Sequence, residues 1–168
     1  MKRLSWIAVL LLTACAIPFT LVEPVRQSAA GLSVEPGMRW NAVGLQHWEG
    51  RIAVWTQDGP TLNTLLFVGG TADGEPLFTI RPGDDGAATR QEAPPVFRRT
   101  MTSLEGAELF QATLARNFRT TLVEIGTVTP TRFLGQQGFR FETRYTGRDE
   151  VERDGTFVGA VRDGKLYA

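Results

Sequence analysis

The sequence predicts an α+β fold: an antiparallel β-sheet with one main amphipathic helix packed on a face, after an N-terminal signal helix and a tether. Asp-Gly pairs, which are strong turn signals, recur between short runs rich in β-branched and aromatic residues. A single later segment has helical periodicity instead. The Asp-Gly pairs lie at 58–59, 73–74, 85–86, 154–155 and 163–164.

The first segment combines a positive start with a short apolar run. Lys2 and Arg3 precede an apolar stretch from Leu4 to Leu12, which is followed by the small residues Thr13 and Ala14. A stretch of this length is too short to span a bilayer comfortably, and the arrangement is typical of a secretory signal. We therefore expect export from the cytoplasm.

The end of this segment, Leu12-Thr13-Ala14-Cys15, resembles the bacterial lipobox. The resemblance implies that the Cys15 thiol receives a diacylglyceryl group, that a peptidase cuts between Ala14 and Cys15, and that the new amino terminus is usually acylated as well. Two or three chains anchor a protein stably, whereas one chain holds only marginally. Because residue 16 is Ala and not Asp, the resemblance favours the outer membrane over the inner one.

Two other ways of processing the N-terminus remain open. An uncleaved signal anchor would use residues 4–22, although Pro18 and Thr20 weaken such a span. An ordinary signal peptidase could instead cut after Ser28-Ala29-Ala30, with Glu23 and Arg26 lying before the cut. Either alternative keeps the protein in the cell envelope, facing the periplasm.

The domain boundaries follow from this interpretation. Residues 1–14 form the signal peptide, residues 15–31 the lipidated cysteine and a flexible tether, and residues 32–168 a single α+β domain. Strands are expected over residues 51–56, 65–68 and 76–80, with an exposed loop at 83–95.

One helix is expected after that loop. Thr102 and Glu105 fit a capping box, in which each side chain satisfies a free backbone N–H at the helix start. An apolar face follows at three- and four-residue spacing, formed by Leu104, Ala107, Phe110, Leu114 and Phe118.

The strands resume after the helix, at residues 121–125 and 138–145. In the second of these, Phe139, Phe141, Thr143 and Tyr145 alternate with charged residues, so one face is expected to be buried. Residues 156–162 and 165–168 predict a hairpin about Asp163-Gly164. The last strand either closes the sheet or belongs to a C-terminally truncated fragment, and the second alternative is slightly favoured because so short a strand gains little pairing.

The order of elements, with "GFRFE" and "GKLYA" near the end, resembles uncharacterised small envelope lipoproteins of alphaproteobacteria. More distantly it resembles the PsbP-like and DcrB-like α/β sandwiches. Because proteins of the latter kind act mainly in binding or assembly, the resemblance favours a protein that is not an enzyme.

The composition provides few residues for catalysis or metal binding. Lys plus Arg and Asp plus Glu number 18 each, and loss of residues 1–14 leaves 16 basic against 18 acidic residues, a net charge of −2. The longest basic run is Arg98-Arg99, so no nucleic-acid partner is expected. With one cysteine and one histidine, neither an intramolecular disulfide nor a cysteine zinc cluster can form, and no cofactor or metal is predicted.

Three clusters were weighed as sites. His47 and Glu49 share a strand face but lack a nucleophile motif, and a surface histidine is the favoured interpretation. Asp84-Asp85-Gly86 lacks the ligand spacing of a calcium loop, and no pair of acids is set for glycoside hydrolysis. A binding platform of Trp40, Trp48 and Trp55 is the minority interpretation beside a core role.

The sequence thus predicts a membrane-anchored envelope lipoprotein with no enzymatic activity, which binds an envelope protein partner or helps to maintain the envelope. The alternative is a carrier of a small apolar ligand, with a cavity between helix and sheet lined by residues such as Phe110, Phe139 and Trp55.

Overall fold

The computed structural model describes residues 18–44, 51–59, 62–79, 93–118, 120, 122–147 and 149–168. It confirms the α+β class, with mostly antiparallel sheets and one helix. The expected signal helix and Cys15 lie outside these residues. Among the helices formed by the described residues, none is long and apolar enough to cross a membrane.

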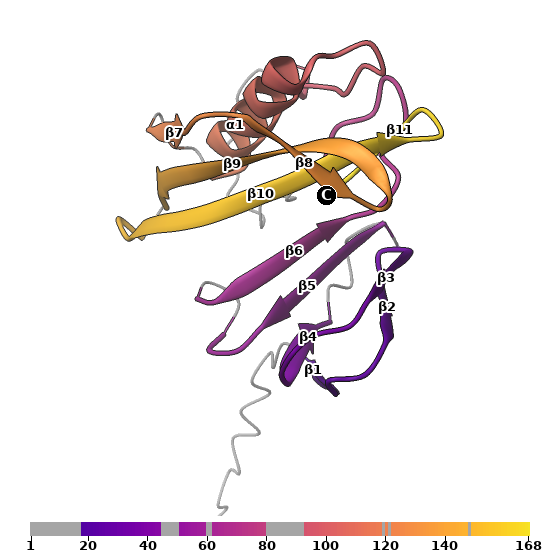
Figure 1. Cartoon of the computed structure of the whole chain (residues 1–168). Helices are drawn as coiled ribbons and strands as arrows, with labels where there is room; N and C mark the ends of the chain where they lie inside the picture. The colour runs from indigo at the N-terminus through magenta and orange to yellow at the C-terminus, as the bar shows by residue number, and fades with distance from the viewer. Residues whose placement is uncertain are drawn as a thin grey trace, which may run out of the picture.

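Two main sheets form the framework (Figure 1). The first has the strand order β1-β4-β5-β6, and the second has the order β11-β10-β9-β7, with β8 also paired to β9. A small β2-β3 hairpin forms a third, two-stranded sheet. The strands are β1 (Phe19–Val22), β2 (Gln27–Ala29), β3 (Leu32–Val34), β4 (Trp40–Val43), β5 (Ile52–Thr56), β6 (Thr64–Val68), β7 (Val123–Ile125), β8 (Thr129–Phe133), β9 (Gln136–Thr146), β10 (Glu152–Arg162) and β11 (Lys165–Tyr167).

The last residues of the chain join the two main sheets. Val68 and Ala168 exchange two backbone hydrogen bonds of 2.7 and 2.9 Å, and Thr71 and Leu166 exchange two more of 2.9 Å each. The predicted hairpin about Asp163-Gly164 is confirmed, and both of these residues have positive φ. The short terminal strand therefore gains pairing on both of its edges, which the sequence did not lead us to expect.

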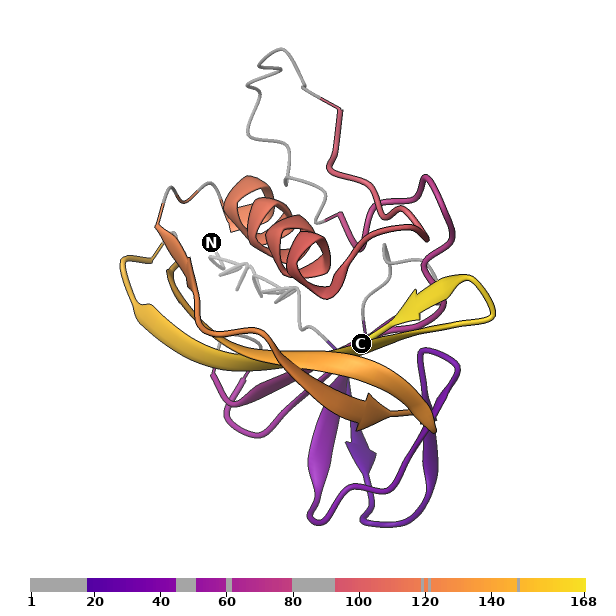
Figure 2. The same cartoon turned by 45° about the horizontal axis from the view of Figure 1, so that its top comes forward.

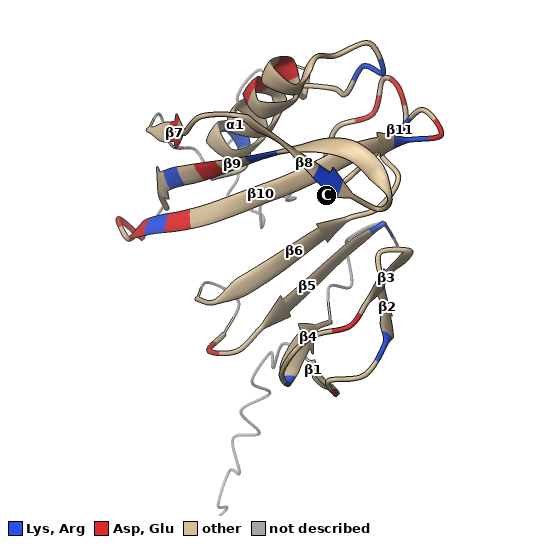
Figure 3. Cartoon of the chain, viewed as in Figure 1, with Lys and Arg blue, Asp and Glu red and all other residues tan. Residues whose placement is uncertain are grey.

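The long β9-β10 hairpin separates a buried face from a charged one. The predicted alternation is confirmed, since Phe139, Phe141 and Thr143 are buried. Arg140, Glu142 and Arg144 are exposed on the opposite face, and these charges lie along β9 and β10 in Figure 3. The period-two pattern of the sequence is the cause, because successive side chains of a strand point to opposite faces.

The helix α1 (Ser103–Phe118) lies across the sheet of β9 and β10 (Figure 2). Its predicted capping box is confirmed: the N–H of Thr102 donates to Oε2 of Glu105 at 2.6 Å, and the N–H of Glu105 donates to the Thr102 hydroxyl at 3.3 Å. These bonds lower the pKa of Glu105, the backbone bond contributing most.

The buried face of α1 is wider than predicted. Ala107 and Leu114 are buried as expected, but Leu104 is 60% exposed, so its placement on the buried face was wrong. Leu109 is buried as well, because the segments before the helix pack against that side. The buried amide of Asn117 donates to the carbonyl oxygens of Phe78 and Thr113, at 3.3 and 2.9 Å.

The main core lies between α1 and the sheet. Its rings pack closely, with centroid distances of 4.8 Å for Phe110–Phe157, 4.8 Å for Phe141–Phe157 and 5.4 Å for Phe139–Phe157. Phe157 thus contacts three other rings. The buried members of this core are Val68, Leu77, Phe78, Phe97, Ala107, Leu109, Leu114, Val123, Phe139, Phe141, Phe157 and Leu166.

A smaller core lies on the other side of the first sheet, where the β2-β3 hairpin packs. Its buried members are Val22, Ala29 and Trp55. The carbonyl oxygen of Ala30, in the hairpin turn, lies so close to Gly69 that an added Cβ there would be 1.7 Å away. The predicted flexible tether over 15–31 is therefore corrected for residues 19–22 and 27–29, which form strands of the domain.

Two local predictions were also wrong. No strand forms over 76–79, the described part of 76–80, although Leu77 and Phe78 are buried. The pair Asp154-Gly155 forms no turn but continues β10, where Asp154 and Gly155 pair with Arg144 and Thr143 of β9. Long-range pairing has overridden the local turn preference there.

Candidate functional site

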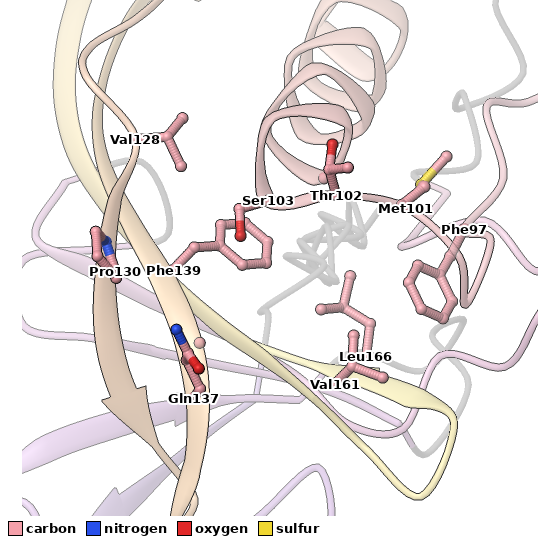
Figure 4. A pocket seen from close by; sticks show the side chains of 12 residues that line it. Phe97, Met101, Thr102, Ser103, Val128, Pro130, Gln137, Phe139, Val161 and Leu166 are labelled. Atoms are coloured by element: carbon pink, nitrogen blue, oxygen red, sulfur yellow. The ribbon is translucent and has the colours of Figure 1, made fainter.

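A hollow with a volume of about 320 Å³ lies between the start of α1 and the sheet (Figure 4). Phe97, Phe139 and Leu166 provide apolar walls, and Val128 and Pro130 line the side formed by β8 and the segment before it. This volume lies at the lower end of the range for small-molecule pockets. The pocket can therefore take a small, mostly apolar molecule.

A few polar groups line the same pocket. The hydroxyls of Thr102 and Ser103 come from the helix start, and the amide of Gln137 comes from β9 on the opposite wall (Figure 4). The Thr102 hydroxyl already accepts the N–H of Glu105, so the helix cap and the pocket share this side chain. Such an arrangement suits a ligand with an apolar body and one neutral polar group.

A second hollow of about 540 Å³ continues along the helix. It lies between α1 and the segment joining β7 to β8, and includes Leu104, Gln111 and Ile125. Val128 belongs to both hollows. We call the two together the helix groove. The exposed Leu104, which the periodicity assigned to the core, lines this groove instead.

The residues predicted to line a cavity are only partly brought together. Phe139 lines the first hollow, whereas Phe110 packs in the aromatic cluster of the main core. Trp55 lies in the smaller core, beyond the first sheet, and is 3% exposed. Phe97 and Leu166 were not identified from the sequence as lining residues. They come together in the hollow only because the end of the chain pairs with a distant segment.

Several other candidates lie outside the described residues, namely His47, Trp48, Glu49, Asp84 and Asp85. In the part of the chain that the structure describes, no three His, Cys, Asp or Glu side chains converge on a possible metal position. Trp40 is partly buried and packs with Trp55 against the smaller core, which is the packing role favoured from the sequence.

On the charged face of β9 and β10, the acidic and basic side chains pair with one another. Arg144 donates to Asp154 at 2.7 Å and also lies 3.6 Å from Glu152, and these contacts raise the pKa of Arg144. At the turn after β9, Arg153 donates to Asp149 and lowers the pKa of that carboxyl to about 2. Arg98 and Arg99 are exposed, and the backbone N–H of Arg99 donates to Asp73 at 2.9 Å.

Cys15 lies outside the described residues, but the start of the described chain at Pro18 shows how the N-terminal segment joins the domain. The N–H of Gly44 donates to the carbonyl oxygen of Pro18 at 2.7 Å. Pro18 packs so tightly that a Cβ at Gly44 would lie 2.5 Å from its ring. The chain is therefore fixed to the sheet from residue 18, three residues after Cys15.

In comparisons with known proteins, no family model, no curated protein and no solved structure matches the chain.

Proposed function

We propose that this chain is an envelope lipoprotein, cut before Cys15, lipidated on that residue, and carrying a non-enzymatic binding domain on the periplasmic side of the outer membrane. The observation that carries the proposal is the position of β1. This strand begins four residues after Cys15 and is paired along its length with β4. A cut before Cys15 leaves every strand of the domain intact.

The two alternative ways of processing fit the structure less well. A cut after Ala30 would remove β1 and β2, and with them the buried side chains of Val22 and Ala29. An uncleaved span over 4–22 would need Phe19–Val22 in the bilayer, yet these residues pair with β4. A strand cannot serve in the sheet and in a spanning helix together.

Metabolic labelling with a palmitate analogue tests the proposal in a bacterial host that processes lipoproteins. The wild-type protein is expected to incorporate label and to fractionate with membranes, and Cys15→Ser to incorporate none. A matched control combines Cys15→Ser with Ser28→Cys, because it keeps one thiol but moves it out of the lipobox. Label on this control, or none on the wild type, would contradict lipidation at Cys15.

The proposed binding role rests on the surface of the domain. Charges on the β9-β10 face are paired with one another, and the described residues hold no metal-ligating cluster. The helix groove is the concave surface available for a partner side chain or a ligand. We therefore assign the domain to partner binding or envelope maintenance.

The second candidate function, a carrier of a small amphiphile, is favoured by the 320 Å³ hollow and its polar rim. Val128→Trp would fill the groove where its two parts meet, and Leu62→Trp, at an exposed turn, is the matched control. Native mass spectrometry of the purified protein should show a bound small molecule in wild type and control but not in Val128→Trp. An absence of bound mass in all three would reject the carrier.

A further inference from the structure

The edge strand β1 presents an apolar surface that the core does not use. Phe19 and Leu21 point to the same face of the strand and are 49% and 56% exposed. Thr20 and Val22 alternate with them, and Val22 is buried in the smaller core. Strand β1 is the edge strand of its sheet, and Phe19 and Leu21 lie on the face of it opposite to Val22.

This surface lies next to the proposed lipid attachment. Phe19 is four residues after Cys15, so a fully extended chain places it at most about 14 Å from that residue. The hydrogen bond from Gly44 to Pro18 holds the chain on the sheet from residue 18 onward, so the segment between Cys15 and the domain is no longer than this. A lipid on Cys15 would therefore hold β1 within reach of the headgroup layer, not allow the domain to swing on a tether.

The charges around β1 favour an apolar contact over an electrostatic one. Glu23 and Arg39 pair at 3.0 Å, and Arg26 and Glu35 at 3.8 Å, so these two described arginines after β1 each have an acidic neighbour. The mature chain carries more acidic than basic residues. Attraction to anionic lipid is thus weak, and burial of the apolar side chains in the interface is the remaining driving force.

We propose that Phe19 and Leu21 form the surface by which the domain lies against the bilayer that holds the Cys15 lipid. The occupant of this surface is the phospholipid interface. The inference rests on the proposed lipidation, and adds that the anchor fixes the orientation of the domain. The helix α1, which forms one wall of the helix groove, lies at the opposite end of the molecule from β1 (Figure 1).

The test uses the lipidated protein in phosphatidylcholine vesicles. Since the lipid consumes the native thiol, Leu21→Cys offers a single site for an environment-sensitive fluorophore, and Leu62→Cys, of similar exposure on the β5-β6 turn, is the matched control. Phe19→Cys provides a second position should the label at 21 disturb folding. The label at 21 or 19 is expected to shift to the blue on membrane binding, to be quenched by spin-labelled lipid, and to lose quenching by iodide.

Each other outcome overturns the inference. If the protein carries lipid but the labels at 21 and 62 respond alike, docking fails while lipidation stands. If position 21 is shielded from iodide equally in detergent and is not quenched by lipid, a second copy of the chain covers it. If mass spectrometry finds no lipid on Cys15, the proposed function and the docking fail together.

Discussion

The two hydrophobic cores of this molecule differ in what they depend on. The main core is built by α1, the β9-β10 hairpin and the segments that precede the helix. The smaller core consists of Val22, Ala29 and Trp55, two of which come from residues 18–31. The main core is therefore independent of how the N-terminus is processed, whereas the smaller core depends on a cut that spares β1 and β2.

This difference gives the position of the cut a structural consequence. A peptidase acting before Cys15 preserves both cores, and one acting after Ala30 leaves Trp55 without Val22 and Ala29. Each core can therefore be perturbed separately from the other.

The largest loss is expected from Phe157→Ala in the main core. Phe157 contacts three other rings, and removing a buried Phe side chain costs about 3–5 kcal/mol of unfolding free energy. Urea unfolding of the mature domain measures the loss. Phe157→Leu is the control, and should retain most of the stability. An equal loss in both variants would mean that the packing of the aromatic rings does not cause the loss of unfolding free energy.

In the smaller core, Gly69→Ala is expected to cost about 1–3 kcal/mol, because the new Cβ would overlap the carbonyl oxygen of Ala30 and displace the β2-β3 hairpin. The near-UV circular dichroism of the tryptophans should change along with the stability. Gly37→Ala is the control, since a Cβ there meets nothing within 4 Å. Unchanged stability in Gly69→Ala would mean that the hairpin is not packed on β6 as described.

At the helix start, Thr102→Ala is expected to cost about 1 kcal/mol, since it removes the side-chain acceptor of the cap. Thr102→Ser keeps the acceptor and should be nearly neutral. Thermal unfolding followed by far-UV circular dichroism measures both. Because Thr102 also lines the groove, equal stability in both variants with altered ligand binding would shift its main role to the pocket.

The smallest effect concerns pH. The pKa of Asp149 is lowered to about 2 by Arg153, so the pair adds stability above the ordinary pKa of an aspartate, about 3.9, and this contribution is lost as the pH falls through the folded-state value. Asp149→Asn should therefore be slightly less stable at neutral pH and lose less than wild type between those values. Asp163→Asn, in the other hairpin turn, is the matched control, and an identical change in both variants would contradict the assignment.

The elements that could be predicted are those encoded locally. The alternation from Phe139 to Tyr145 defined a strand face, and the Thr102–Glu105 spacing defined the helix start. The turn at Asp163-Gly164 was also correct, because both residues tolerate positive φ.

The elements that were missed depend on distant partners. Strand β1 follows an apolar N-terminal segment and lies between Pro18 and Pro24, so nothing local marks Phe19–Val22 as part of a sheet. Its pairing with β4 makes it a strand. Asp154-Gly155 has a local turn signature, but the seven other register pairs between β9 and β10 keep it extended in β10. The groove was missed in detail because Phe97 and Leu166 meet only when the chain end joins the two sheets.

The measurement that tests the central claim most directly is the intact mass of the protein purified from the envelope of a bacterial host, with its N-terminal peptide sequenced by mass spectrometry. The account predicts a chain that begins at Cys15 and carries the mass of a diacylglyceryl group, with or without a further acyl chain. A chain that begins at residue 31, or one that retains Met1 and bears no lipid, would contradict it.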